Sequence, residues 1–163
     1  MDINEAYENL GYKKVFASLD GSDLQYDVLA RAIVIASNNH AGLSVGHVID
    51  ATVFEGTGIS IGSVVPKLEQ AFRNQIAPLI DDAAANPRIP NVEVQIKVGR
   101  IRETLKEKMI DVIEPDVIVC GARGLSSIKY ALLGSISTYL LRNCTCDILV
   151  VKRPAIAGAS KPL

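Results

Sequence analysis

The stretch that decides the fold is DVIVCGARG, residues 116–124, followed after nine residues by Gly134-Ser135. Its first part is a short apolar run, which indicates a buried strand. Its second part is rich in glycine and leads, through Gly134-Ser135, into the helical pattern of residues 136–142. Glycine lets the backbone come close to an anion, and the first turn of a helix offers N–H groups without intrahelical partners. The stretch therefore predicts a cradle for a phosphorylated small molecule.

Short apolar runs alternate with helical patterns along the rest of the chain. Strands are expected at residues 14–19, 43–49, 92–98, 116–120 and 148–151, and helices at 22–39, 64–85, 101–113 and 136–142. This alternation predicts an α/β fold with a parallel sheet and helices on both faces. We expect Ser22 to cap the first helix and Pro66 to lie in the first turn of the second. Leu68 and Val112 are expected to face the core.

The composition fits one globular domain over residues 1–163, with its core at about 13–154. Of the 163 residues 48% are hydrophobic and 21% are charged. The net charge of -1 argues against a protein that binds nucleic acids or membrane surfaces, because such proteins are usually basic. No apolar stretch is long enough to span a bilayer, and the acidic, polar start differs from a signal peptide. We therefore expect a cytoplasmic location.

The cysteines and histidines are expected to be structural. The chain has three cysteines, Cys120, Cys144 and Cys146, and this odd number does not indicate a disulfide framework. Cys144 and Cys146 form a Cys-x-Cys pair, but no second pair or flanking histidine completes a zinc site. Buried, reduced thiols are the expectation. His47 lies at the end of the second strand, but the sequence ties no nucleophile to it. We therefore predict no catalytic residue and no metal ligand.

The candidate ligand site lies where the strands end. In open parallel sheets, ligands bind beyond the carboxyl ends of the strands, where the strand order reverses. The first strand ends before Asp20 and the fourth before Gly121. Asp20 could accept hydrogen bonds from a ribose, or it could only cap the helix that follows. Both roles are compatible, and ligand contact is favoured.

The spacing Gly121-x-x-Gly124-x9-Gly134-Ser135 resembles the nucleotide-binding signature of the universal stress protein family. The Asp20-Gly21-Ser22 turn and residues 46–50 at the end of the second strand agree with it, and the resemblance extends from about residue 13 to 154. It implies a Rossmann-like, five-stranded sheet of order 3-2-1-4-5, similar to the adenine nucleotide alpha hydrolases. It also implies adenine nucleotide binding, and usually a homodimer.

The resemblance further implies a role for each matching position. Asp20 would contact the ribose or adenine side, Leu43 the base, and Cys120 would border the ligand. Backbone N–H groups would line the ribose and phosphates at Gly121, Gly124, Gly134, Ser135 and Ile136. Arg123 and Ser137 would add phosphate contacts. The ligand would be ATP, or AMP or ADP, with or without Mg²⁺ on the phosphates.

Two functions of different class follow. The first is a nucleotide-binding regulator of the stress response. The second is a slow ATP hydrolase or phosphotransferase, although the chain lacks a Walker loop and an evident base. An interaction module without nucleotide is a third possibility, and the intact glycine spacing argues against it. Residues 148–151 form an apolar strand expected at a sheet edge, which predicts pairing with a second copy.

Overall fold

The computed structural model describes residues 2–122 and 134–152. One parallel sheet with the order β3-β2-β1-β4-β5 forms the centre of the molecule. Its strands are β1 (Lys14–Leu19), β2 (Gly42–Asp50), β3 (Val92–Gly99), β4 (Val117–Gly121) and β5 (Asp147–Val151). The predicted α/β class and the strand order implied by the resemblance are both confirmed. The strand order reverses between β1 and β4, which makes this pair the topological switch point.

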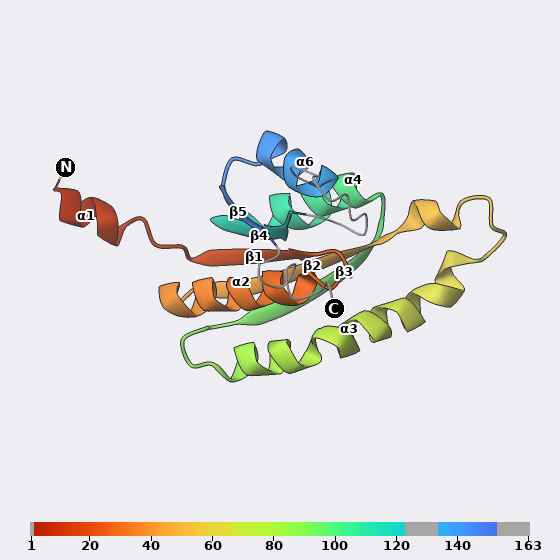
Figure 1. The fold of residues 1–163 in the computed structure, drawn as a ribbon, viewed down its shortest axis with the longest axis horizontal. Helices are drawn as coiled ribbons and strands as arrows, with labels where there is room; N and C mark the ends of the chain where they lie inside the picture. Colours follow the sequence, from red (N-terminus) through yellow and green to blue (C-terminus); the bar gives the residue numbers. More distant parts are fainter. Residues whose placement is uncertain (1, 123–133, 153–163) are drawn as a thin grey trace, which may run out of the picture.

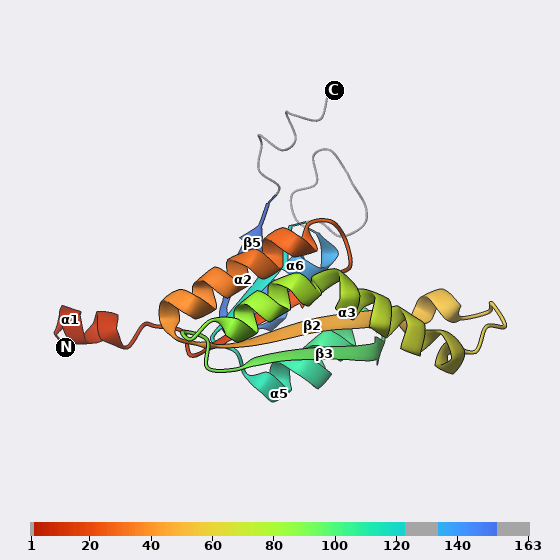
Figure 2. The same cartoon turned by 90° about the horizontal axis from the view of Figure 1, so that it is seen from below.

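Helices cover both faces of the sheet (Figures 1 and 2). One face carries α2 (Gln25–Asn39) and α3 (Ile61–Ala85). The other carries α6 (Ser135–Asn143) and a composite helix of α4 (Ile101–Leu105), the π-helical segment η2 (Lys106–Ile110) and α5 (Asp111–Ile113). A short helix η1 (Ala51–Phe54) follows β2, and α1 (Ile3–Glu8) projects away from the sheet at the start of the chain.

The alternation of side chains along the central strands creates two core layers. In β1, Val15, Ala17 and Leu19 pack toward α2 and α3, whereas Phe16 packs toward the composite helix and α6. All four side chains are buried. Because successive strand residues point to opposite faces, a strand buried on both sides needs an apolar run instead of an alternating pattern. This is why β1 and β4, which lie inside the sheet, are continuous apolar runs.

Gly46 in β2 allows the composite helix to approach the sheet. A Cβ atom at this position would lie within 2.8 Å of the Met109 sulfur and would overlap the ring of Phe16. Real Cβ contacts essentially never come so close. The second core layer therefore depends on the absence of a side chain at Gly46, and on the π-helical segment that supplies Met109.

The beginnings of two helices differ from the prediction. Ser22 does not cap α2, which begins at Gln25; the Ser22 hydroxyl donates instead to Asp20 Oδ1 at 2.6 Å. The carbonyl of Ser22 accepts the Gln25 N–H in a turn before the helix. Pro66 lies inside α3, because that helix begins three residues earlier than expected, at Ile61. The sequence signals for both helix starts are present, but Ser22 takes part in the turn before α2, and α3 begins before the turn that contains Pro66.

Two side chains expected in the core are exposed. Val112 is 70% exposed, because the π-helical turn before it adds a residue and shifts the helical phase, so that Ile110 is buried in its place. Leu68 is 41% exposed. It lies in the early part of α3, which extends with η1 beyond the sheet at the right of Figure 1.

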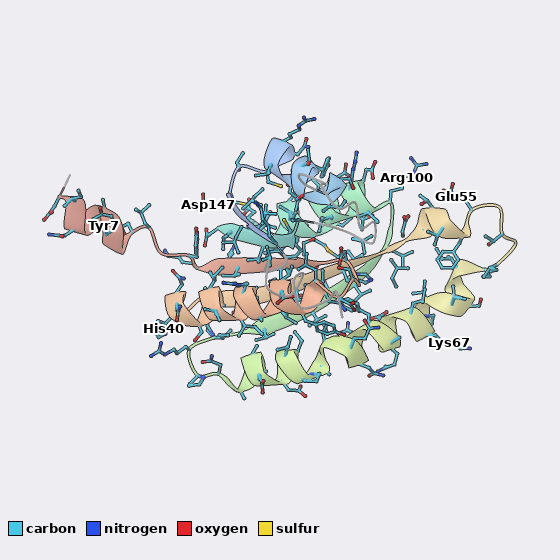
Figure 3. All side chains as sticks on the ribbon, in the orientation of Figure 1. Tyr7, His40, Glu55, Lys67, Arg100 and Asp147 are labelled. Carbon is cyan, nitrogen blue, oxygen red and sulfur yellow. The ribbon has the colours of Figure 1, made fainter. Side chains whose placement is uncertain are left out.

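Hydrogen bonds fasten the strands at the amino edge of the sheet, where they begin. Asp116 Oδ2 accepts the backbone N–H groups of Lys13 and Lys14 at 2.7 and 2.8 Å, which joins the entry of β4 to that of β1. The Tyr12 hydroxyl donates to Asp147 Oδ2 at 2.9 Å, which joins the same segment to β5. Figure 3 labels Asp147 at this edge and Arg100 at the opposite, carboxyl edge.

Candidate functional site

The carboxyl edge at the switch point brings together residues that are far apart in the chain. Ala17 of β1 pairs with Val119 of β4, so the parallel register places Leu19 level with Gly121. Asp20 follows directly after β1 and therefore lies next to the end of β4. The Gly134 N–H donates to the Ala122 carbonyl, which brings the start of α6 to the same place. Of the predicted site residues, Arg123 and Gly124 lie outside the described residues.

Asp20 is exposed, and among the described residues only one of its two carboxylate oxygens accepts hydrogen bonds. Its Oδ1 atom accepts the backbone N–H of Ser22 at 2.9 Å and the Ser22 hydroxyl at 2.6 Å. Within residues 2–122 and 134–152, no donor reaches its Oδ2 atom. Asp20 does not cap α2, whose N-cap residue is Leu24. The local bonds fix the carboxylate at the edge and leave one acceptor oxygen for a hydroxyl or an amine.

The first turn of α6 offers backbone donors. Gly134 is the N-cap residue and makes no side-chain capping bond. Ser135, the first helical residue, is exposed, and Ile136 is half-buried. A helix start without a cap leaves N–H groups for an external acceptor, and the helix dipole favours an anion there. A phosphate oxygen is such an acceptor.

Ser137 belongs to the helix more than to its open end. Its side chain is fully buried, and its hydroxyl donates to the Gly134 carbonyl at 3.0 Å. Thr138 donates its backbone N–H to the same carbonyl. The Ser137 hydroxyl thus closes the first turn of α6. Its backbone N–H remains the group through which this residue could meet a phosphate.

Cys120 ends the buried part of β4 and faces the second core layer. Burial raises the pKa of its thiol to about 12, and the neighbouring Cys144 adds to the shift. The side chain is therefore an uncharged, apolar surface at neutral pH. Such a surface suits the border of a ligand and excludes a role as a nucleophile.

The structure does not bring Leu43 to the carboxyl edge. Leu43 pairs with Val15 near the start of β1, and His47, four residues later, pairs with Leu19 at its end. At about 3.3 Å per residue, Leu43 lies roughly 13 Å from the edge. It is also completely buried beneath α2 and α3. A base bound at the edge could not contact it there, and Val48, near the end of β2, is closer to the required position.

His47 lies beside the switch point and is held on two sides. Its Nδ1 atom is 2.9 Å from the Leu19 carbonyl oxygen, and its ring stacks on Phe72 of α3 with centroids 4.0 Å apart. Burial lowers the pKa of the imidazole, and this outweighs the opposing influence of the Leu19 carbonyl and of Asp20. The ring is thus neutral near pH 7. It links the end of β1 to α3.

This arrangement defines a class of protein. A doubly wound parallel sheet, with an acidic side chain and an uncapped helix start meeting at its switch point, is typical of α/β proteins that bind small ligands at that edge. The model of the Universal stress protein family matches residues 11–152. The chain therefore belongs to the universal stress protein family, and the resemblance seen in its glycine spacing is confirmed.

Individual relatives agree with this assignment. A Staphylococcus saprophyticus protein named for the family is 27% identical over 153 residues, which cover 94% of this chain and 91% of the relative. The fold alone is shared with a protein solved as a test case of structural genomics, which matches with a TM-score of 0.75 at 23% identity, over 88% of this chain and 98% of its own. A universal stress protein solved in complex with cAMP matches with a TM-score of 0.59 at 26% identity, over 86% and 97%.

Among the described residues, no helix is both long enough and apolar enough to cross a membrane. The longest, α3, spans 25 residues but carries charges along its length, and two prolines lie inside it. Its role in the fold is to cover one face of the sheet, as Figure 2 shows.

Proposed function

We propose that the carboxyl edge between β1 and β4 binds an adenine nucleotide, and that this protein acts as a nucleotide-dependent regulator of the stress response in the cytoplasm. The observation that carries the proposal is the bond between Gly134 and Ala122, which holds the uncapped start of α6 beside Asp20. An anion-binding helix end and a carboxylate acceptor lie together there. A nucleotide presents the matching groups, which are phosphates and ribose hydroxyls.

In this proposal each residue has a distinct task. Asp20 Oδ2 accepts from the ribose or the adenine, because Oδ1 is already engaged with Ser22. The backbone N–H groups of Ser135 and Ile136 face the phosphates at the start of α6, and Gly134, whose own N–H is bonded to the Ala122 carbonyl, lets the backbone come close to them. Cys120 provides an apolar border. Arg123 and Gly124 would complete the cradle, and Mg²⁺ would accompany a triphosphate.

Two further points support adenine as the base. The chain belongs to the universal stress protein family, and one solved relative of that family is a complex with cAMP, which is itself an adenine nucleotide. The choice among ATP, ADP and AMP depends on the phosphates, since ribose and adenine are common to all three.

The direct test has two stages. The purified protein is denatured, the supernatant is analysed for adenine nucleotides, and the affinity of the stripped protein for ATP is measured by calorimetry. Gly124→Val should lower that affinity at least a hundredfold by filling the cradle, while the unfolding midpoint stays within the range of the parent. Unchanged binding by this variant would refute the site. Rapid release of phosphate from ATP would favour the hydrolase alternative.

We also propose a two-fold dimer through β5. This strand lies at the end of the sheet order, and Leu149 at its centre is 40% exposed. An apolar edge strand with open backbone groups tends to pair with another chain. An antiparallel pair of β5 strands would satisfy both copies. Light scattering at micromolar concentration should give twice the chain mass, and a monomer mass would refute the dimer.

A further inference from the structure

A cavity at the amino edge of the sheet lies apart from the proposed nucleotide site. It has a volume of about 270 Å³ and lies between the composite helix and the loop that joins α6 to β5. Its lining residues include Glu114, Cys144 and Cys146, together with the ion pair between Lys106 and Asp111. Lys106 and Ile110 come from the π-helical segment, and π-helical turns occur frequently at functional sites.

The two thiols lie on the same side of the chain. Cys144 has extended backbone angles, φ -108° and ψ 146°. From Cys144 onward, half-buried residues alternate with exposed ones into β5, so that Thr145 is exposed and Cys146 is half-buried. Side chains two residues apart on an extended segment point the same way. Both side chains therefore pack against the second core layer, and both residues line the cavity.

This spacing disfavours a disulfide between them. Two residues of extended chain separate the Cα atoms by about 6.6 Å, near the upper limit for a disulfide, and the Cβ atoms stay similarly far apart. Burial raises the pKa of both thiols, so few reactive thiolates form at neutral pH and both thiols resist oxidation. The positive charge of Lys106, which lies close to Cys144, acts in the opposite direction and lowers the pKa of that thiol.

The same spacing suits a metal ion bridged between the two sulfurs. Among the described residues, no group of three His, Cys, Asp or Glu side chains could hold a metal ion. Structural zinc needs four ligands, so it is excluded from this pair of thiols. A soft, monovalent ion with few ligands is different, because Cu(I) prefers thiolates and is stable with two of them.

We propose that Cys144 and Cys146 form a two-thiolate site for Cu(I) at the amino edge of the sheet. Each thiol gives up its proton to solvent and forms one sulfur–copper bond, and copper remains Cu(I) throughout. One positive ion and two thiolates leave a net charge of -1 on the complex. The Lys106 ammonium lies beside Cys144 and offsets that charge, while Asp111 holds Lys106 in place.

Anaerobic titration of the reduced, full-length protein with Cu(I), in competition with bicinchoninate, tests the proposal. The parent should bind one equivalent. Cys144→Ala and Cys146→Ala should each lower the affinity at least a hundredfold. Thr145→Ala is the matched control, because Thr145 lines the same cavity between the two cysteines but carries no thiol, and it should bind like the parent. Lys106→Met should weaken binding about tenfold by removing the compensating charge.

Circular dichroism of each variant separates loss of the site from loss of the fold. Full binding by folded Cys144→Ala or Cys146→Ala would overturn the proposal. So would an equal loss of affinity in Thr145→Ala, or an affinity of the parent for Cu(I) no greater than that of a variant without any cysteine. Equal affinity of the parent for Zn²⁺ would also contradict it, since two thiolates select the softer ion.

Discussion

The two edges of the sheet use their carboxylates in opposite ways. At the amino edge, Asp116 accepts two backbone N–H groups and Asp147 accepts the Tyr12 hydroxyl, so each carboxylate joins separate segments. At the carboxyl edge, and among residues 2–122 and 134–152, Asp20 bonds only within its own turn and keeps one carboxylate oxygen open. The difference supports the proposal that stability and ligand contact are divided between the two edges of one sheet.

The largest effect is expected from Asp20 at the carboxyl edge. Asp20→Ala should lower ATP affinity about 10- to 100-fold, because a hydrogen bond to a charged group contributes about 1.5–3 kcal/mol. The free energy of unfolding should change little, since the bonds lost are local and exposed. Calorimetry with ATP and urea unfolding measure the two quantities. An affinity within twofold of the parent would remove Asp20 from the site.

A change in the layer between the edges should affect stability alone. Gly46→Ala should lower the free energy of unfolding by about 1–3 kcal/mol, because the new methyl group overlaps Phe16 and Met109. Gly62→Ala is the control: it lies in α3, and the nearest atom to its Cβ is 3.9 Å away. That variant should be as stable as the parent or more so. Equal urea midpoints for both variants would contradict this packing.

Asp116→Ala should remove the hydrogen bonds that join β4 to β1 at the amino edge and leave ATP binding at the carboxyl edge unchanged. The loss of two hydrogen bonds from backbone N–H groups to a carboxylate should cost about 1–2 kcal/mol of stability, with water replacing part of it. Asp116→Asn, which retains an acceptor oxygen, should recover some of this. ATP affinity should match that of the parent in both variants. A tenfold loss of affinity would show that the edges are not independent.

The smallest effect concerns pH and His47. Burial lowers the pKa of His47 in the folded protein, so the unfolded chain binds the proton more readily. The contribution of this residue is complete above the unfolded pKa of about 6.5 and is lost as pH falls toward the folded pKa. Urea unfolding at pH 7.5 and 5.5 should show a larger decrease for the parent than for His47→Gln. Equal decreases would show that burial of His47 has no such effect.

The sequence predicted the parts of the fold that local patterns determine. The apolar runs at residues 14–19 and 116–120 placed β1 and β4 to within a residue, because strands buried on both faces leave a continuous signal. The π-helical turn at Lys106–Ile110 had no such signal, so Val112 was wrongly expected in the core. The short helix α1 was not expected either.

The candidate site was predictable to a similar extent. Asp20, Gly121 and Gly134 do meet at the switch point, as their places at strand and helix ends implied. Leu43 was misplaced, because the resemblance assigns a strand but only the register fixes which residue reaches the edge. The half-used carboxylate of Asp20 and the buried hydroxyl of Ser137 depend on tertiary geometry, which no pattern of residue types encodes.

Hydrogen–deuterium exchange of the full-length protein, with and without saturating ATP, tests the division between the two edges most directly. The account predicts slower exchange in peptides that cover residues 20–22, 121–124 and 134–138, and unchanged exchange around residues 12–14 and 143–147. Protection confined to the amino edge, or no protection at any segment at saturating ATP, would contradict it.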